Sequence, residues 1–431
     1  MGRVLFVVPP LHGHVNPTVA LGAELTSRGH EVAWCGYREL VEGLLPAGSE
    51  MIAVGSAIPA GIIETVRSKS QGLRGGLALE FLWKDFLCPL ARAMVPGVEA
   101  AVDSFGPDLL VVDQQALAGA VVGRRRKMLW ATSATTSAEL VDPFRMLPKV
   151  GEWVRQRLAD LERELGVDSG AGDDLRFSPH LVLAFTTEAL AGKPVLPEGA
   201  GPVAFVGPSL PAARPLPDGA PLPDGGRDPT FPWEWLDGEG PRLLVSLGTV
   251  NMSAGGRFFA TAVEALAAGG RLDSSGARAL LVADPEMFES LPGNVLVRPS
   301  VPQVELLGRM GAVVCHGGHN TVCEALSMGI PLVVAPIRDD QPIIAEQVTA
   351  AGAGVRVRFA RVRPAELAEA IEAALFDPEL RAGAARVQAS FAAAGGAPGA
   401  ADRLEQLLGV PERAREALLV PGGRARPPAR G

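Results

Sequence analysis

The sequence has few cysteines, no long hydrophobic segment and no excess of basic residues. Its four cysteines form no Cys-x-x-Cys pair and follow no disulfide or zinc spacing, so we expect reduced thiols in a cytoplasmic protein. No run reaches the ~18 apolar residues that a membrane-spanning helix needs. The apolar run Val4–Val8 is too short for a signal peptide and is followed by Pro9-Pro10. Acidic residues outnumber basic ones by 48 to 40, which argues against nucleic acid as a partner.

Several catalytic signatures are also missing. The sequence has no G-x-x-x-x-G-K-[ST] loop and no G-x-G-x-x-G after its first predicted strand, which argues against nucleotide hydrolysis and classical dinucleotide binding. It has no G-x-S-x-G nucleophile elbow. No two Asp residues are separated by exactly one residue, and His12 and His14 have no Cys or carboxylate nearby at metal-ligand spacing. We therefore expect no metal.

The first half of the chain alternates apolar runs with helical patterns. Val4–Val8 predicts a strand buried on both faces, and Asn16 and Pro17 predict the N-cap and first position of a helix ending near Arg28. Residues 31–37 predict the next strand, and the three elements together form a βαβ unit of Rossmann type. Further strands are expected at 107–113, 129–131 and 181–184.

The composition changes at residues 208–241, which hold nine prolines and the tandem repeat PLPDGA-PLPDGG. Such a segment is a stiff linker. Beyond it the alternation resumes, with strands expected at 243–247, 279–282, 294–297, 312–315, 331–335 and 354–358. The sequence thus predicts an α/β protein with two doubly wound parallel sheets, whose carboxyl ends face one cleft.

The expected domains follow from these patterns. They are an N-terminal domain over 1–207, the linker 208–241, a C-terminal domain over 242–385, a helical segment over 386–410 that returns to the N-terminal domain, and a disordered tail over 411–431.

Residues 312–324 carry the strongest local signal. An apolar strand runs into Gly317-Gly318 and then into a helix start. Glycines let backbone N–H groups approach a ligand, and a helix N-terminus attracts negative charge. The pattern predicts an anion site that suits a diphosphate. Thr321 and Glu324 also match a capping box, a purely structural alternative of equal weight.

Two more positions carry candidate chemistry. Asp340-Gln341 begins a helix after a strand, where carboxylate and carboxamide groups suit sugar hydroxyls, although Asp340 could equally be an N-cap. His14 lies in the first loop and is a candidate general base, with His12 as its rival. Asp113 ends another strand, from which its carboxylate can orient the imidazole and stabilise the cation. Without such a partner, a single histidine in a loop is most often an ordinary polar residue of the surface.

Taken in order, these residues resemble the family 1 glycosyltransferases of GT-B fold, and more closely the bacterial macrolide and natural-product glycosyltransferases. Residues 13–17, Gly-His-Val-Asn-Pro, resemble the loop that carries the family's catalytic base, and 107–113 the strand that ends in its Asp partner. Pro302-Gln303, 316–324 and Asp340-Gln341 resemble the donor-binding signature in order and spacing. The resemblance covers nearly the whole chain.

The resemblance implies an inverting transfer from a UDP- or dTDP-sugar, with no metal or other cofactor. His14 would deprotonate the acceptor and Asp113 would balance its charge. The leaving diphosphate would be stabilised by backbone amides, the helix dipole and His316. The donor-side residues it implies are Ser246, Thr249, Gln303, His316, Gly318, His319, Asn320, Thr321, Glu324, Asp340 and Gln341. Gln303 would contact the base, Glu324 the ribose, and the last two the sugar.

The chain departs from the family pattern at two positions. Ser300 stands where the family usually has an aromatic residue that stacks on the base, which leaves uracil and thymine both open. Arg298 is a possible substitute for that stacking. His319 stands where plant relatives have Trp, which leaves the sugar open.

The expected acceptor is a hydrophobic natural product: a polyketide, a carotenoid-like lipid, or a fused aromatic such as an indolocarbazole glycosylated on nitrogen. Aromatic and macrocyclic acceptors are favoured, and the enzyme is expected to be a monomer or homodimer. The candidate acceptor-pocket residues are Phe81, Trp83, Phe86, Trp130 and Phe144. For each of them, ordinary core packing is the favoured alternative.

Two other functions stay open. A nucleotide-sugar epimerase of GT-B fold would need neither an apolar acceptor pocket nor the His14–Asp113 pair. A non-catalytic GT-B partner protein would be expected to lose His14 or the donor residues, and this sequence has both sets.

Overall fold

The structure is a computed structural model of the 431-residue chain. It describes residues 1–55, 58, 62, 73, 76–145, 147–167, 170, 172–210, 231–248, 255–267 and 271–410. Thr249, the tail 411–431 and most of the expected linker lie outside the described residues. The described chain forms two compact units, one of residues 1–186, 193–210 and 394–410, the other of residues 187–192 and 231–393.

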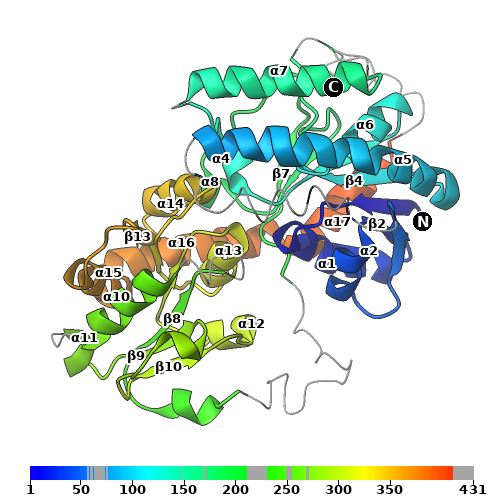
Figure 1. The fold of residues 1–431 in the computed structure, drawn as a ribbon. Coiled ribbons are helices and arrows are strands. Elements are labelled where there is room, and N and C mark those ends of the chain that lie inside the picture. The colour runs from blue at the N-terminus through cyan, green and yellow to red at the C-terminus, as the bar shows by residue number, and fades with distance from the viewer. Residues whose placement is uncertain are drawn as a thin grey trace, which may run out of the picture. The chain divides into compact units, whose positions relative to one another are not determined.

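The first unit is built on a seven-stranded parallel sheet (Figure 1). Its strands are β1 (Arg3–Val7), β2 (Glu31–Gly36), β3 (Glu50–Ala53), β4 (Leu109–Asp113), β5 (Trp130–Ala134), β6 (Val182–Ala184) and β7 (Val203–Phe205). They lie in the order β3-β2-β1-β4-β5-β6-β7. The order reverses between β1 and β4, and sheets of this type bind ligands beyond the strand ends at such a switch point.

Helices cover both faces of this sheet. The helical elements are α1 (His12–Ser27), α2 (Arg38–Val41), η1 (Glu42–Leu44), α4 (Gly76–Phe81), η2 (Leu82–Leu87), α5 (Cys88–Phe105), α6 (Leu117–Arg125), η3 (Ser137–Leu140), α7 (Pro148–Glu164) and α17 (Gly396–Leu408). Leu5 and Val7 point to a core shared with α5, α6 and α7. Val4 and Phe6 point to a second core shared with α1 and α17. Strands buried on both faces explain the uninterrupted apolar runs.

The last helix packs against the first one. Ala400, Ala401, Leu404 and Leu407 of α17 are buried in the same core as Leu25 of α1. At the edge of this contact, Nη1 of Arg28 lies 2.6 Å from Asp402 and 2.8 Å from Glu405. The preceding helix α16 (Pro378–Ala394) belongs mainly to the second unit, and Gly395 and Gly396, both at positive φ, separate the two helices.

The second unit holds a six-stranded parallel sheet in the order β10-β9-β8-β11-β12-β13. Its strands are β8 (Arg242–Ser246), β9 (Arg278–Val282), β10 (Val295–Arg298), β11 (Ala312–Cys315), β12 (Leu332–Val334) and β13 (Gly354–Arg356). Besides α16, its helical elements are α8 (Glu188–Ala191), η4 (Trp233–Asp237), α10 (Gly256–Ala267), α11 (Arg271–Ser274), η6 (Pro285–Met287), α12 (Gln303–Leu307), α13 (His319–Ser327), α14 (Gln341–Ala350) and α15 (Pro364–Phe376). The predicted pair of doubly wound parallel sheets is confirmed.

Three details differ from the sequence-based expectations. Helix α1 begins at His12, not at Pro17, so Asn16 is no N-cap and Pro17 lies inside the helix. Proline is tolerated there because it removes only one backbone hydrogen bond close to the helix start. Strands β3 and β7 were not predicted. Helix α8 packs with α14 in the second unit, although it falls within the expected N-terminal domain.

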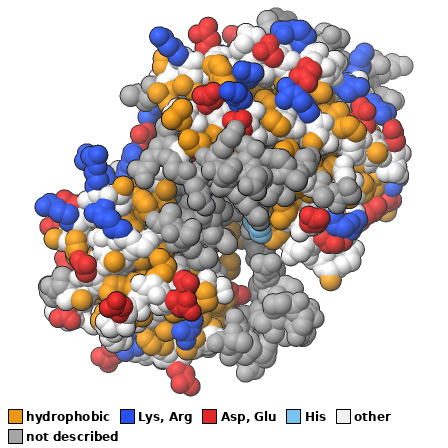
Figure 2. Space-filling view, viewed as in Figure 1, with side chains coloured by type: hydrophobic (Ala, Val, Ile, Leu, Met, Phe, Trp, Pro, Cys, Tyr) orange, Lys and Arg blue, Asp and Glu red, His pale blue; other side chains and the backbone are white. Residues whose placement is uncertain are grey.

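The surface of the described residues carries both signs of charge. On the face drawn in Figure 2, Lys and Arg side chains alternate with Asp and Glu, and the described part of that face shows no extended basic patch. Among the helices that the structure describes, none is both long and apolar enough to cross a bilayer.

Candidate active site

His14 and Asp113 meet at the switch point of the first sheet. Strands β1 and β4 are hydrogen-bonded neighbours, with Val7 opposite Val112. His14 lies in the first turn of α1, just beyond β1, and Asp113 is the last residue of β4. Nδ1 of His14 lies 2.9 Å from Oδ1 and 3.0 Å from Oδ2 of Asp113. The rival candidate, His12, is exposed.

Thr135 is a third member of this cluster, and sequence reasoning missed it. Its hydroxyl lies 2.8 Å from Oδ2 of Asp113 and 2.8 Å from Nδ1 of His14. The backbone N–H of Gln115 donates to Oδ1 of Asp113 over 2.8 Å. The Asp113 side chain is fully buried, whereas 16% of the His14 side chain is exposed. A buried carboxylate held by three donors therefore orients a partly exposed imidazole.

The donor-side motif forms a glycine-lined loop at the end of β11. Gly317 takes a φ of +89°, a conformation that favours glycine, and Gly318 is the N-cap of α13. The His316 imidazole lies against two glycines: a Cβ on Gly248 would come within 2.8 Å of the ring, and one on Gly318 within 2.6 Å. The loop thus packs an imidazole where a side chain on either glycine would collide with it.

The His316 side chain is half-buried, and this environment keeps its ring neutral. Burial lowers the pKa of His316 to about 4, against the opposing effect of the Ser246 backbone. Its Nδ1 is buried and makes no hydrogen bond of ordinary geometry to the described residues. A neutral imidazole beside a helix N-terminus can donate one hydrogen bond to an anion while it keeps a single tautomer.

The structural alternative for Thr321 and Glu324 is wrong, and that for Asp340 is met in position only. Helix α13 begins at His319 with Gly318 as its N-cap, so Thr321 lies within the first turn and forms no capping box with Glu324. Asp340 does occupy the N-cap position of α14, but its carboxylate makes no capping hydrogen bond.

Glu324 is instead paired with Gln303. Nε2 of Gln303 donates to Oε2 of Glu324 over 2.5 Å, which joins α12 to α13. Burial raises the pKa of Glu324, and the hydrogen bond from Gln303 opposes that shift. The two residues that the resemblance placed at the base and the ribose therefore lie side by side.

The remaining donor-side candidates lie near this loop or are held by other contacts. Ser246 is buried at the end of β8, opposite Cys315 of β11. His319 is buried with Nε2 3.4 Å from Sγ of Cys323. Oε1 of Gln341 accepts the backbone N–H groups of residues 337 and 338, which leaves its amide nitrogen for other partners. Asn320 is the second residue of α13, next to His319.

The candidate acceptor-pocket aromatics are mostly core residues. Trp83, Phe86, Trp130 and Phe144 are each at most 7% exposed and belong to the core beneath α5, α6 and α7. The guanidinium of Arg176 lies 5.5 Å from the ring centre of Trp83 and 6.0 Å from that of Phe144. Phe81 is half-buried. Core packing accounts for the four buried rings.

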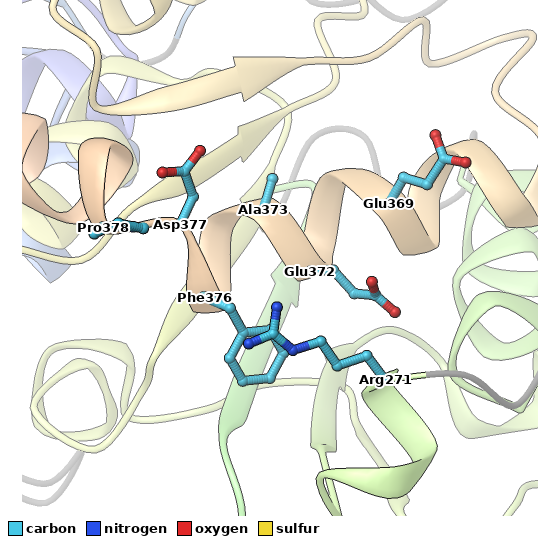
Figure 3. A pocket seen from close by; sticks show the side chains of 7 residues that line it. All are labelled: Arg271, Glu369, Glu372, Ala373, Phe376, Asp377 and Pro378. Carbon is cyan, nitrogen blue, oxygen red and sulfur yellow. The ribbon is translucent and has the colours of Figure 1, made fainter.

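A surface hollow of about 410 Å³ in the second unit includes none of the candidate residues. It is lined mainly by α15, which contributes Glu369 and Glu372, and by Arg271, whose guanidinium stacks on Phe376 (Figure 3). Within the described residues, no three His, Cys, Asp or Glu side chains gather as a metal site.

Comparison with known proteins identifies the class. Residues 264–407 match the family model described as "Erythromycin biosynthesis protein CIII-like, C-terminal domain". The chain is 28% identical to the NDP-glycosyltransferase YjiC of Bacillus subtilis, over 93% of this chain and 95% of that one. It is also 28% identical to the 4'-demethylrebeccamycin synthase of Lentzea aerocolonigenes, over 94% and 99%. The crystal structure of the calicheamicin glycosyltransferase CalG4 superimposes with a TM-score of 0.73 at 25% identity, over 95% and 99% of the two chains.

The chain is a glycosyltransferase of GT-B fold. In this glycosyltransferase, the matched family model spans the loop of His316 and the pair Gln303–Glu324, whereas His14, Asp113 and Thr135 lie outside it.

Proposed function

We propose that this glycosyltransferase moves a sugar from a UDP- or dTDP-sugar to a hydrophobic small-molecule natural product, with inversion at the anomeric carbon. His14 acts as the general base and Asp113 as its charge partner. The observation that carries the proposal is the hydrogen bond of 2.9 Å between Nδ1 of His14 and the buried carboxylate of Asp113. The cysteines, all free and buried, agree with action in the cytoplasm.

The geometry of the pair supports its role as a base. A carboxylate only accepts hydrogen bonds, so Nδ1 of His14 carries the proton. The lone pair of the neutral ring then lies on Nε2. In the reaction Nε2 takes the hydroxyl or N–H proton of the acceptor as the acceptor attacks the anomeric carbon. Asp113 stabilises the imidazolium that results, as the acid does in catalytic triads.

The second unit would hold the donor. His316, the amides at the start of α13 and the positive end of its helix dipole face the diphosphate and stabilise the charge that builds up as it leaves. Gln303 and Glu324 take the base and the ribose, and Asp340 and Gln341 the sugar hydroxyls. A relative named as an NDP-glycosyltransferase supports a nucleoside-diphosphate donor. His316, the backbone amides and the helix dipole would take the place of a metal ion in stabilising the leaving diphosphate.

The donor is tested by thermal stabilisation with UDP, dTDP, GDP and NAD. A ligand that binds only the native state stabilises it by about 2.7 kcal/mol at a hundredfold excess over its Kd. We expect UDP or dTDP to raise the melting temperature, and GDP and NAD to leave it unchanged. No shift with UDP or dTDP at millimolar concentration would refute the donor site.

The base is tested with His14→Ala, and His12→Ala is the matched control two residues away. Transfer is followed as release of nucleoside diphosphate from UDP-glucose and dTDP-glucose with a panel of aromatic and macrocyclic alcohols. A positioned base contributes about 10²–10⁴-fold, so we expect H14A to lose that factor and still bind nucleotide. Transfer at the wild-type rate by folded H14A would refute the assignment. An epimerase would instead convert the donor to its epimer without any acceptor.

A further inference from the structure

We infer that Thr135 is a positioning residue of the catalytic base: its hydroxyl holds the Asp113 carboxylate in line with Nδ1 of His14, so that the proton of the ring stays on Nδ1. The inference rests on the proposed role of His14 as the base. It concerns a residue that follows β5 and belongs to none of the motifs identified in the sequence.

The positions of the protons follow from the three short contacts. Oγ1 of Thr135 lies 2.8 Å from Oδ2 of Asp113 and 2.8 Å from Nδ1 of His14. The hydroxyl has one proton, and the carboxylate can only accept, so this proton is donated to Asp113. The oxygen of Thr135 then presents a lone pair to Nδ1. Nδ1 must carry a proton, because otherwise it would face three acceptor atoms within 3.0 Å.

The contacts form a closed triangle. His14 donates to Asp113 and Thr135, and Thr135 donates to Asp113. Because both contacts are made by Nδ1, rotation of the ring about its Cβ–Cγ bond would break two hydrogen bonds. Asp113 alone would orient the ring through one group. Thr135 adds a second partner for Nδ1, which leaves the lone pair of the neutral ring on Nε2.

The fold holds Thr135 firmly. Ser133 lies opposite Asp113 in the β4–β5 register, and Thr135 follows two residues later, so both are brought to the same end of the sheet. Thr135 is 3% exposed. The next turn, η3, is anchored through Glu139, which is paired with the buried Arg176. Arg176 is in turn paired with Asp174 over 2.7 Å.

Replacement of the hydroxyl by a methyl group isolates its role. Thr135→Val preserves shape and removes a hydrogen bond to a charged group, a class of bond whose loss corresponds to about 10–100-fold in rate. We expect kcat to fall by that factor while the KM for donor and acceptor stays near the wild-type value. Thr135→Ser restores the hydroxyl and should recover most of kcat.

Thr186→Val is the matched control. Thr186 follows β6 in the same sheet and is fully buried, and its hydroxyl makes no hydrogen bond to the residues that the structure describes. The same substitution there removes a buried hydroxyl and leaves kcat unchanged. A general effect of Thr-to-Val changes in this core would lower kcat in both variants and would overturn the inference.

The second readout is the tautomer of His14, measured by ¹⁵N NMR of protein labelled at histidine. The chain has six histidines, and the signal missing from H14A identifies His14. Near pH 8 we expect the wild type and T135S to show the proton on Nδ1. In T135V the Asp113 carboxylate loses the donor that holds it in line with the ring, so we expect a mixture of the two tautomers.

The outcomes separate this inference from the proposed function. If H14A retains full transfer, the base assignment fails and takes this inference with it. If H14A loses transfer while T135V keeps both the wild-type kcat and the Nδ1–H tautomer, the base assignment stands and the role of Thr135 is refuted. If T135S fails to rescue a defective T135V, the defect comes from packing and the inference is again refuted.

Discussion

Gly318→Ala should weaken nucleotide binding through the imidazole of His316. The backbone at Gly318 has a φ of −63° and a ψ of 133°, which alanine adopts without strain. Its Cβ would lie 2.6 Å from Nε2 and 2.7 Å from Cε1 of His316. Comfortable contact between such atoms is about 3.5 Å, so the ring must shift by about 1 Å. Gly248 also lies against the His316 ring, where an added Cβ would come within 2.8 Å of Cε1.

The size of the effect follows from that displacement. Crowding of this kind costs about 1–3 kcal/mol of stability. A hydrogen bond from His316 to the diphosphate is one to a charged group, worth about 1.5–3 kcal/mol, so its loss raises the Kd by about 10–150-fold. Isothermal titration with UDP and dTDP measures this Kd. Gly308→Ala is the control, because a Cβ there meets no atom within 4 Å and its φ is −60°.

The double variant sharpens the test. If G318A acts through His316, then adding it to His316→Ala should weaken binding little further, because the two changes remove the same interaction. A wild-type Kd in folded G318A would refute the idea that the position of the imidazole matters. Additive losses in the double variant would show that Gly318 acts through its own backbone.

Three further predictions concern other parts of the fold. Leu404→Ala, in the buried face of α17, should lower the free energy of unfolding by about 2–5 kcal/mol in urea, whereas the exposed Leu40→Ala should change it by less than about 0.5 kcal/mol. The native pKa of His316, about 4, lies below its usual 6.5, so the unfolded chain binds this proton first. Stability should be full above pH 6.5 and fall as the pH drops, by about 2 kcal/mol between pH 7 and pH 5; His316→Asn should remove that part of the slope, and an unchanged slope would contradict the pKa. Gln303→Ala removes the hydrogen bond that opposes the effect of burial on the pKa of Glu324. The pKa of Glu324 should therefore rise further in this variant. As the pH is lowered, the affinity for dTDP should begin to fall at a higher pH than in the wild type, which titration with dTDP at a series of pH values would show.

Most strands were predictable because parallel strands covered on both faces consist of uninterrupted apolar residues. Runs such as residues 109–112 and 312–315 are of this kind, and the structure places strands there within a residue or two. The missed strands, β3 and β7, are short edge strands with one neighbour each and are only partly buried. They show little of the apolar pattern that marks the others.

The candidate site was predictable only where it coincided with a motif. His14, Asp113 and the loop after β11 lie at strand ends, where chemistry-bearing residues stand out. Thr135 has no sequence signal of its own. It is found only from the β4–β5 register, which places the residues after Asp113 and Ser133 together. The buried aromatics illustrate the opposite error, since size and apolarity do not distinguish a pocket wall from a core.

The packing of α17 against α1 has a consequence for the folding of the chain during its synthesis. The first unit is completed by the last described helix, so a nascent chain that has made residues 1–210 must await about 185 more before α17 exists. At about 5–20 residues per second, translation of that interval takes about 10–40 s. During this time the face of α1 that will receive Ala401 and Leu404 has no α17 to cover it. Residues 396–408 are therefore needed to complete the core of a unit whose other strands and helices lie within residues 1–210.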